Sequence, residues 1–178
     1  MKINLADKSI EPIIIRYIEE EDNASIARVL RASVEEHEAP KVGTFYDDPH
    51  TDMMFQTFNI KSAAYWVVEC NDSILGGGGF YPTKGLPNGY AELSKFHFRP
   101  ELRGKGIGKY LLQLIEQEAI KVGYTHMYIV SYHQFGNAVA MYQRCGYEHI
   151  DNALDQSGLY KDAPIHMVKE LKKSVTIE

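Results

Sequence analysis

The stretch YAELSKFHFRPELRGKGIGKYLL, residues 90–112, decides the fold of this chain. Its first part alternates apolar and polar side chains, which predicts a strand over residues 90–98. A turn is predicted at 100–104, followed by a helix over 105–121 that Gly123 closes. The apolar face of that helix consists of Ile107, Leu111, Leu114 and Ile115, joined by Tyr110 and Ala119. A strand, a glycine-rich turn and a helix therefore follow one another.

The alternation slips inside the strand. Ala91 and Leu93 set one phase, and Phe96 resumes it three positions after Leu93 instead of two, with Phe98 following. A β-bulge inserts one extra residue in this way and leaves main-chain groups unpaired. Such groups can pair with an extended, amide-bearing ligand as they would with an added strand. An ordinary strand with an irregular pattern explains the slip equally well.

The turn itself, RGKGIG at residues 103–108, is suited to binding an anion. Glycines allow a ligand to approach the backbone closely, and the free N–H groups and dipole at a helix N-terminus favour negative charge. Arg103 and Lys105 add positive charge. The pattern predicts a pyrophosphate site. The alternative is a glycine-rich connection with solvated basic residues, which the flanking strand and helix disfavour.

Two familiar phosphate motifs fit poorly. In the dinucleotide-binding pattern G-x-G-x-x-G the third glycine would come one residue after Gly108. In the P-loop pattern the residue after Lys109 is Ser or Thr, and here it is Tyr110. Neither motif therefore accounts for the predicted pyrophosphate site.

The rest of the chain supplies more strands and helices. Strands are predicted at residues 13–18, 65–70, 74–81, 125–132 and 164–171. Helices are predicted from Asp22 or Asn23 onward, as a short element within 51–59, and from Ala138 to Cys145. Hairpin strands come first, and a strand–helix–strand unit follows that should be parallel and right-handed. We expect a mixed sheet with helices on both faces.

Four consecutive glycines, residues 76–79, fall inside a predicted strand. Glycines weaken a strand and often mark the close approach of another backbone or of a ligand. Of these explanations we favour a bulged or tightly packed hairpin arm.

Composition limits the possible functions. The chain has 178 residues, which fits one domain over 1–178, and a formal net charge of −5. Only residues 99–109 are locally basic, so a broad nucleic-acid surface is not expected. Cys70 and Cys145 do not suggest a disulfide scaffold, and no His/Cys cluster has metal-ligand spacing, so no metal is predicted.

The sequence also bears on location. The N-terminus carries Lys2, Asp7, Lys8 and Glu11 without a long apolar run, which argues against a signal peptide. No stretch approaches the roughly 20 apolar residues of a membrane-spanning helix. We therefore expect a cytoplasmic protein without membrane contact.

Two blocks of sequence resemble the GNAT superfamily of acyl-CoA-dependent N-acyltransferases, within it a bacterial subgroup of small acetyltransferases. The pattern [RQ]-x-x-G-x-[GA] is met by Arg103, Gly106 and Gly108. The block AVAMYQRCGYEHI at 138–150 is similar to A-x-x-[LM]-Y-x-x-x-G-[FY]. With the element order, the resemblance implies an α/β fold (α+β by some schemes) with a mixed, mostly antiparallel sheet of six to seven strands and helices on both faces.

The resemblance also implies roles for residues. Acetyl-coenzyme A would be the cosubstrate, with the backbone of Phe96, His97 and Phe98 pairing with pantetheine amides. The amides from Arg103 to Lys109 would hold the pyrophosphate; they belong to Arg103, Gly104, Lys105, Gly106, Ile107, Gly108 and Lys109. Tyr142 matches the tyrosine that often protonates the leaving thiolate.

The chain departs from the family pattern at two positions. Phe135 stands where many members carry an asparagine that contacts pantetheine, and Asn137 is the candidate to substitute for it. Val130 stands where some members carry a glutamate base. Glu92, on the strand that leads into the slip, is therefore the first candidate for the general base, followed by His97 and His133.

The acceptor would be an amine of a small molecule or of a peptide or protein. The loop and short helix at 39–59 are expected to shape its pocket through Tyr46, Asp47, Asp48, His50 and Phe55. Folds of this kind often pair, so a homodimer is an open expectation. Two other functions remain possible at this point: an inactive acyl-CoA-binding sensor, and a nucleotide-binding protein with an atypical phosphate loop.

Overall fold

The computed structural model describes residues 12–158 and 162–172. The N-terminal residues on which the argument against a signal peptide rests, Lys2 to Glu11, lie outside this range. Among the described residues, the helices are too short or too polar to cross a membrane.

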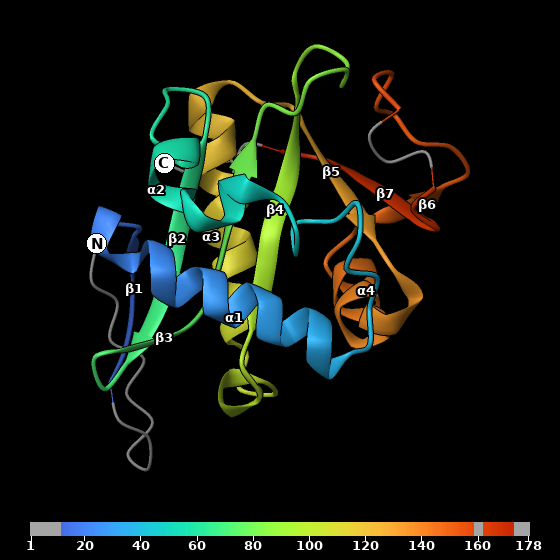
Figure 1. The fold of residues 1–178 in the computed structure, drawn as a ribbon. Coiled ribbons are helices and arrows are strands. Elements are labelled where there is room, and N and C mark those ends of the chain that lie inside the picture. The colour runs from blue at the N-terminus through green and yellow to red at the C-terminus, as the bar shows by residue number, and fades with distance from the viewer. Residues whose placement is uncertain (1–11, 159–161, 173–178) are drawn as a thin grey trace.

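One seven-stranded sheet runs through the described residues, in the order β1-β2-β3-β4-β5-β7-β6 (Figure 1). Its strands are β1 (Ile13–Tyr17), β2 (Ala64–Cys70), β3 (Ser73–Tyr81), β4 (Tyr90–Phe98), β5 (His126–Ser131), β6 (Glu148–Ile150) and β7 (Ile165–Glu170). All neighbours are antiparallel except β4 and β5, which are joined through a helix and run parallel. The predicted mixed, mostly antiparallel sheet is confirmed.

Helices cover both faces of the sheet (Figure 1). They are α1 (Asn23–Glu36), α2 (Met54–Phe58), α3 (Ile107–Val122) and α4 (Gly136–Arg144), with 3-10 turns at Glu20–Asp22, Pro49–Asp52, Pro100–Leu102 and His133–Phe135. The predicted helix start near Asp22, and the Gly123 stop in a left-handed conformation, are confirmed. The helix predicted from 105 begins two residues later because Gly106 is its N-cap.

Two apolar clusters flank the sheet. The α1 and α2 face buries a cluster that includes Ile26, Leu30 and Tyr65. The larger cluster joins α3 and α4 to the other face, and there α3 buries Ile107, Leu111, Leu112, Ile115 and Ala119. Leu112, which was missing from the predicted face, is buried, whereas Leu114 is only half-buried. Each fully buried Leu or Ile contributes about 1.5–3 kcal/mol, so the start of α3 is firmly held.

The glycine run on β3 is a tightly packed arm, as predicted. A Cβ on Gly77 would meet the Trp66 carbonyl at 2.6 Å, and one on Gly79 would overlap the Ala64 carbonyl still more. On the opposite face, the rings of Phe96 and Phe98 occupy the space that side chains at residues 76 and 78 would need. The glycines thus allow β2, β3 and β4 to pack closely with aromatic rings on both sides.

Of the two explanations of the slip in β4, the structure supports the bulge. The β3–β4 register shifts between Gly77 and Gly79, and Lys95 on β4 adopts a left-handed φ of 50°. The Tyr65 hydroxyl donates a 2.8 Å hydrogen bond to the Lys95 carbonyl and so helps hold the bulge. Pairing between β4 and β5 extends only from Tyr90 to Glu92 on β4. Beyond the bulge, β4 and β5 therefore separate and leave an open edge on β4.

Candidate functional site

A hollow of about 640 Å³, here named the loop hollow, lies at the start of α3. It is lined by residues of β4, the glycine-rich turn and α4, together with Ser33 and His37 of α1. The lining contains these residues predicted to contact the cosubstrate: Phe96, His97, Phe98, Arg103, Gly104, Gly106, Ile107, Gly108, Lys109 and Asn137. Lys105 is exposed and lies outside it.

The glycine-rich turn is shaped for a ligand. Gly104 and Gly106 have φ values of 74° and 79°, which favour glycine, and a Cβ at either position would meet nothing within 4 Å. The first N–H groups of α3 lack partners within the helix and carry its positive dipole end. The space beside these amides suits a diphosphate.

The side chain of Arg103, which the sequence predicted to add positive charge for an anion, is bound to Glu36 instead. Its guanidinium forms a forked ion pair with Glu36, with N···O distances of 2.5 and 2.7 Å. Its Nε and one terminal nitrogen also donate to the Phe98 carbonyl at 3.2 and 2.9 Å. The positive charge that Arg103 was expected to offer an anion is therefore offset by Glu36.

The main-chain groups of His97 and Phe98 face opposite edges of β4. The Arg99 N–H donates to the Leu75 carbonyl of β3 at 2.8 Å. Since successive residues of a paired strand direct their main-chain groups to opposite edges, those of His97 face β3 and those of Phe98 face the open edge. Phe98 is thus the better placed of the two to pair with a ligand, and it would do so through its N–H, since its carbonyl accepts from Arg103.

A second hollow of about 380 Å³, the sheet hollow, lies where β4 and β5 separate. Glu92, Lys95 and Tyr142 are among its lining residues. It shares Phe96, His97, Phe135 and Ala138 with the loop hollow. The two hollows therefore adjoin at these four residues.

Glu92 and Tyr142 enter the sheet hollow from different elements. Glu92 is 7% exposed, and its carboxylate accepts a short hydrogen bond from the Thr83 hydroxyl. Tyr142, on α4, is 5% exposed, and burial raises its pKa, with a smaller contribution from Cys145. Tyr142 is thus protonated at neutral pH and available as a proton donor.

The two histidine candidates differ. Nδ1 of His97 lies 3.0 Å from the Ser33 hydroxyl, and burial, assisted by the charges of His37, Lys95 and Arg103, lowers its pKa to about 3. So low a pKa makes His97 neutral but a weak base. His133 is exposed and lines neither hollow.

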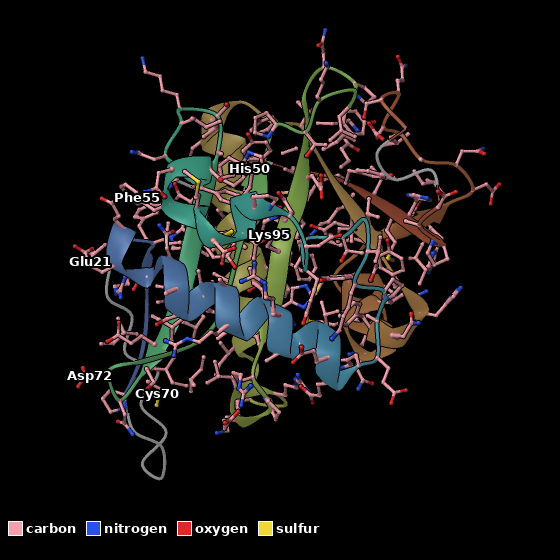
Figure 2. The ribbon with its side chains drawn as sticks, in the orientation of Figure 1. Glu21, His50, Phe55, Cys70, Asp72 and Lys95 are labelled. Atoms are coloured by element: carbon pink, nitrogen blue, oxygen red, sulfur yellow. The ribbon has the colours of Figure 1, made fainter. Side chains whose placement is uncertain are left out.

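The sequence analysis missed Lys95. Its side chain is 12% exposed, and its Nζ lies 3.6 Å from an Asp48 carboxylate oxygen and 5.8 Å from the Phe45 ring centroid. Figure 2 places it on the sheet face that α1 and α2 cover. Burial lowers its pKa, although Asp48 and Glu92 oppose this. The slip in alternation after Leu93 was the available signal, since Lys95 is the residue in the left-handed conformation.

The predicted acceptor loop contributes in part. Asp47 and Asp48 line the sheet hollow, together with Gly43, Thr44 and Phe45. Tyr46, His50 and Phe55 do not: the Tyr46 hydroxyl bonds Glu35, His50 bonds Asp48, and Phe55 packs on the α1–α2 cluster. The loop reaches the hollow over Gly43–Asp48, ahead of the short helix that was also expected to contribute.

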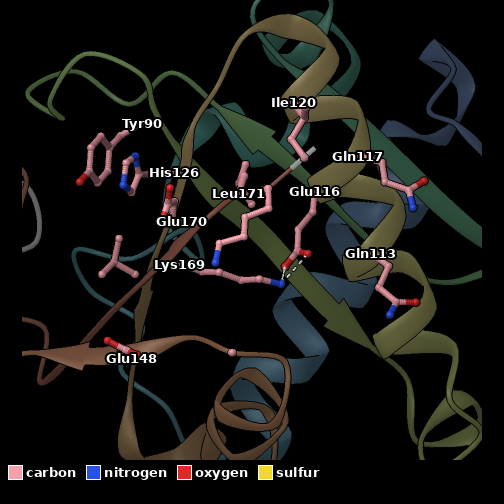
Figure 3. A pocket seen from close by; sticks show the side chains of 13 residues that line it. Tyr90, Gln113, Glu116, Gln117, Ile120, His126, Glu148, Lys169, Glu170 and Leu171 are labelled. Atoms are coloured by element: carbon pink, nitrogen blue, oxygen red, sulfur yellow. Dashed lines mark hydrogen bonds and ion pairs between the residues drawn. The ribbon is translucent and has the colours of Figure 1, made fainter. Parts of the chain in front are cut away.

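A third hollow of about 770 Å³ lies beside α3 and the paired strands β5 and β7 (Figure 3). Lys169 and Glu116 form an ion pair at 2.7 Å in its wall, and the rings of Tyr90 and His126 stack at 4.3 Å. It shares no lining residue with the loop hollow or the sheet hollow.

In the described part of the chain, no group of three or more His, Cys, Asp or Glu residues is placed to hold a metal ion, and Cys70 and Cys145 are free thiols.

Known proteins are similar to this chain in sequence. Residues 29–147 match the Acetyltransferase (GNAT) family. The chain is 35% identical over 159 residues to the uncharacterized N-acetyltransferase YjgM of Escherichia coli (strain K12), which covers 89% of this chain and 95% of that protein.

Solved structures show the same fold. A GNAT-family acetyltransferase from Staphylococcus aureus Mu50 has a TM-score of 0.78 at 19% identity, covering 90% of this chain and 99% of that chain. The structure of yncA from Salmonella typhimurium with its cofactor acetyl-CoA has a TM-score of 0.70 at 18% identity, covering 93% and 98%. The fold, the family match over most of the chain and the relative of similar length agree, and the chain belongs to the acetyltransferase (GNAT) family.

Proposed function

We propose that the chain forms one N-acetyltransferase domain that transfers acetyl from acetyl-coenzyme A to a primary amine. The observation that carries this proposal is the meeting of two hollows at Phe96, His97, Phe135 and Ala138. The loop hollow, of about 640 Å³, lies beside the first amides of α3. The sheet hollow holds a carboxylate, Glu92, and a phenol, Tyr142.

In this proposal the cosubstrate binds in the loop hollow. Amides of the Arg103–Lys109 turn hold the pyrophosphate, and the pantetheine lies along the open edge of β4 near Phe98. Asn137, which lines the same hollow, contacts the pantetheine from α4. The thioester then reaches the point where the two hollows meet.

The reaction is direct attack in a ternary complex. The amine nitrogen forms a bond to the thioester carbonyl carbon, and the carbon–sulfur bond breaks. Glu92 accepts the proton that the amine loses, directly or through water, and Tyr142 donates a proton to the leaving thiolate. Holding the two reactants together supplies much of the rate enhancement.

The acceptor occupies the sheet hollow. Three carboxylates, those of Asp47, Asp48 and Glu92, line it against the single lysine Lys95 among its described lining residues. This balance favours an amine that arrives as a cation, whether on a small molecule or on a peptide. The location in the cytoplasm stays a prediction from the sequence.

The test is thiol release from acetyl-coenzyme A in the presence of amino acids, polyamines, aminoglycosides and peptides, with product mass determined for each. Acetylation of at least one amine class is expected. Tight binding of acetyl-coenzyme A with no turnover on any amine would instead support a sensor that has lost catalysis. Preference for ATP over coenzyme A would contradict the cosubstrate assignment.

A further inference from the structure

Glu36 is the last residue of α1, where a carboxylate is unfavourable to the helix. Glu35 and Glu36 both lie in the last turn of α1, which has no basic residue. The C-terminal end of a helix dipole is negative, so carboxylates there are destabilising unless they are compensated. Lys41 and Tyr46 compensate Glu35, and Arg103 compensates Glu36. The placement of Glu36 therefore needs a reason outside α1.

Arg103 connects Glu36 to both ends of the turn that follows β4. Phe98 is the last residue of β4, and Arg103 follows the 3-10 turn Pro100–Leu102. The guanidinium donates to the Phe98 carbonyl twice and to the Glu36 carboxylate twice. A planar guanidinium that donates four hydrogen bonds to two partners is held in one orientation. The hydrogen bonds to Arg103 lower the pKa of Glu36, so the carboxylate is ionised at neutral pH.

Other contacts from the same turn of α1 reach the same segment of β4. Ser33 contacts His97 at 3.0 Å, and the His37 and His97 rings both contact the Phe135 ring, at 5.1 and 5.2 Å. Ser33 and His37 line the loop hollow themselves. The end of α1 is thus held against the part of β4 that faces the ligand space.

We propose that Glu36 is a positioning residue for the coenzyme A site. It holds the Arg103 guanidinium on the Phe98 carbonyl and so fixes the start of the glycine-rich turn against the end of β4. The turn then presents its main-chain amides in one arrangement, and the Arg103 side chain serves as a brace instead of a phosphate ligand. This inference rests on the proposed function, since it takes coenzyme A as the ligand of the loop hollow.

The rival assignment makes the opposite prediction. If the Arg103 side chain were a phosphate ligand that Glu36 withholds in the unbound protein, removing the Glu36 charge would free Arg103 and tighten coenzyme A binding. If Glu36 is part of a brace, the same change loosens the turn and weakens binding. The sign of the effect on the dissociation constant separates the two.

The experiment is calorimetric titration of coenzyme A into the full chain and its variants. Glu36→Gln and Arg103→Gln are each expected to raise the Kd about three- to tenfold. The Kd of the double variant is expected not to exceed the higher of the two single-variant Kd values, because the two side chains act as one unit. Glu36→Asp, which keeps the charge, is expected to bind more tightly than Glu36→Gln.

The matched control is Glu118→Gln, which breaks the exposed Lys121–Glu118 pair at the other end of α3. Its Kd is expected to equal that of the wild type, and melting temperatures are measured for all variants. A lower melting temperature for Glu36→Gln with an unchanged Kd, or a lower Kd, overturns the proposal. Failure of the wild type to bind coenzyme A would instead contradict the proposed function.

Discussion

The Ser33 hydroxyl lies 3.0 Å from Nδ1 of His97, which joins α1 to β4 two residues beyond the bulge. The contact is compatible with a neutral imidazole, and the surroundings disfavour the charged form: burial and the nearby charges of His37, Lys95 and Arg103 hold the pKa of His97 at about 3. This arrangement has a consequence for stability.

Stability is expected to fall as the pH decreases from about 6.5 toward 3. In the unfolded chain His97 takes up a proton near pH 6.5, whereas in the folded chain it does so near pH 3, so acid favours the unfolded state. With a discount for its partial exposure, the contribution between pH 7 and pH 5 is about 1 kcal/mol. His97→Asn should reduce the loss of melting temperature over this interval, and the exposed His133→Asn should not. Equal losses in both variants would contradict the assignment.

The glycine run on β3 predicts a sharp contrast between two substitutions. Gly79→Ala brings a Cβ into the Ala64 carbonyl, which the β2–β3 pairing holds in place, and should destabilise the fold by about 3 kcal/mol. Gly136→Ala, at the first residue of α4 with φ −53° and open space around it, should stabilise by about 0.5–1 kcal/mol. Urea denaturation measures both, and similar free energies of unfolding would show that the packing of β3 tolerates a side chain.

Tyr142→Phe is expected to lower turnover about 100-fold while the Kd for coenzyme A changes less than about twofold, because only a proton donor is removed. The matched control is Tyr147→Phe. The Tyr147 hydroxyl donates to Glu116, away from both hollows of the site, so its loss should cost about 1 kcal/mol of stability and spare turnover. Steady-state rates on the best amine decide this, and full turnover in Tyr142→Phe would exclude Tyr142 as the acid.

Glu92→Gln should lower turnover at neutral pH at least about tenfold and leave acetyl-coenzyme A binding intact. The remaining activity should rise with pH, as more of the amine becomes neutral without help from a base. Glu69→Gln, which removes the strand carboxylate that pairs with Arg16, serves as the control and should affect stability alone. A pH profile of Glu92→Gln that parallels the wild type would show that another group or water is the base.

Asp48→Asn should raise the Michaelis constant for the amine about tenfold without changing that for acetyl-coenzyme A. The substitution leaves the largely buried ammonium of Lys95 without its ion-pair partner. It also releases the loop that contributes Gly43, Thr44, Phe45, Asp47 and Asp48 to the sheet hollow. Asp72→Asn, on the distant β2–β3 turn labelled in Figure 2, is the control. Equal increases for both substrates would place Asp48 outside the acceptor site.

The sequence by itself determined the order of elements, the glycine-rich turn and the resemblance to the family, and it offered the bulge as one of two explanations of the slip. These features are local: alternation, helical spacing and the need for glycine are properties of consecutive residues, so residues 90–112 and 138–150 were sufficient. Phe98 and most of the Arg103–Lys109 turn, which these local signals singled out, line the loop hollow, and Tyr142 lines the adjoining sheet hollow.

Tertiary structure alone decided which distant side chains meet there. Glu36 and Arg103 are 67 positions apart, and Ser33 and His97 are 64 apart, so no local pattern links them. Their contact depends on how α1 packs across β3 and β4. The slip after Leu93 indicated one extra residue, but only the folded sheet shows that it is Lys95 and that its side chain pairs with Asp48. Pairings of this kind follow from the order of strands and the packing of a helix on them, which periodicity does not specify.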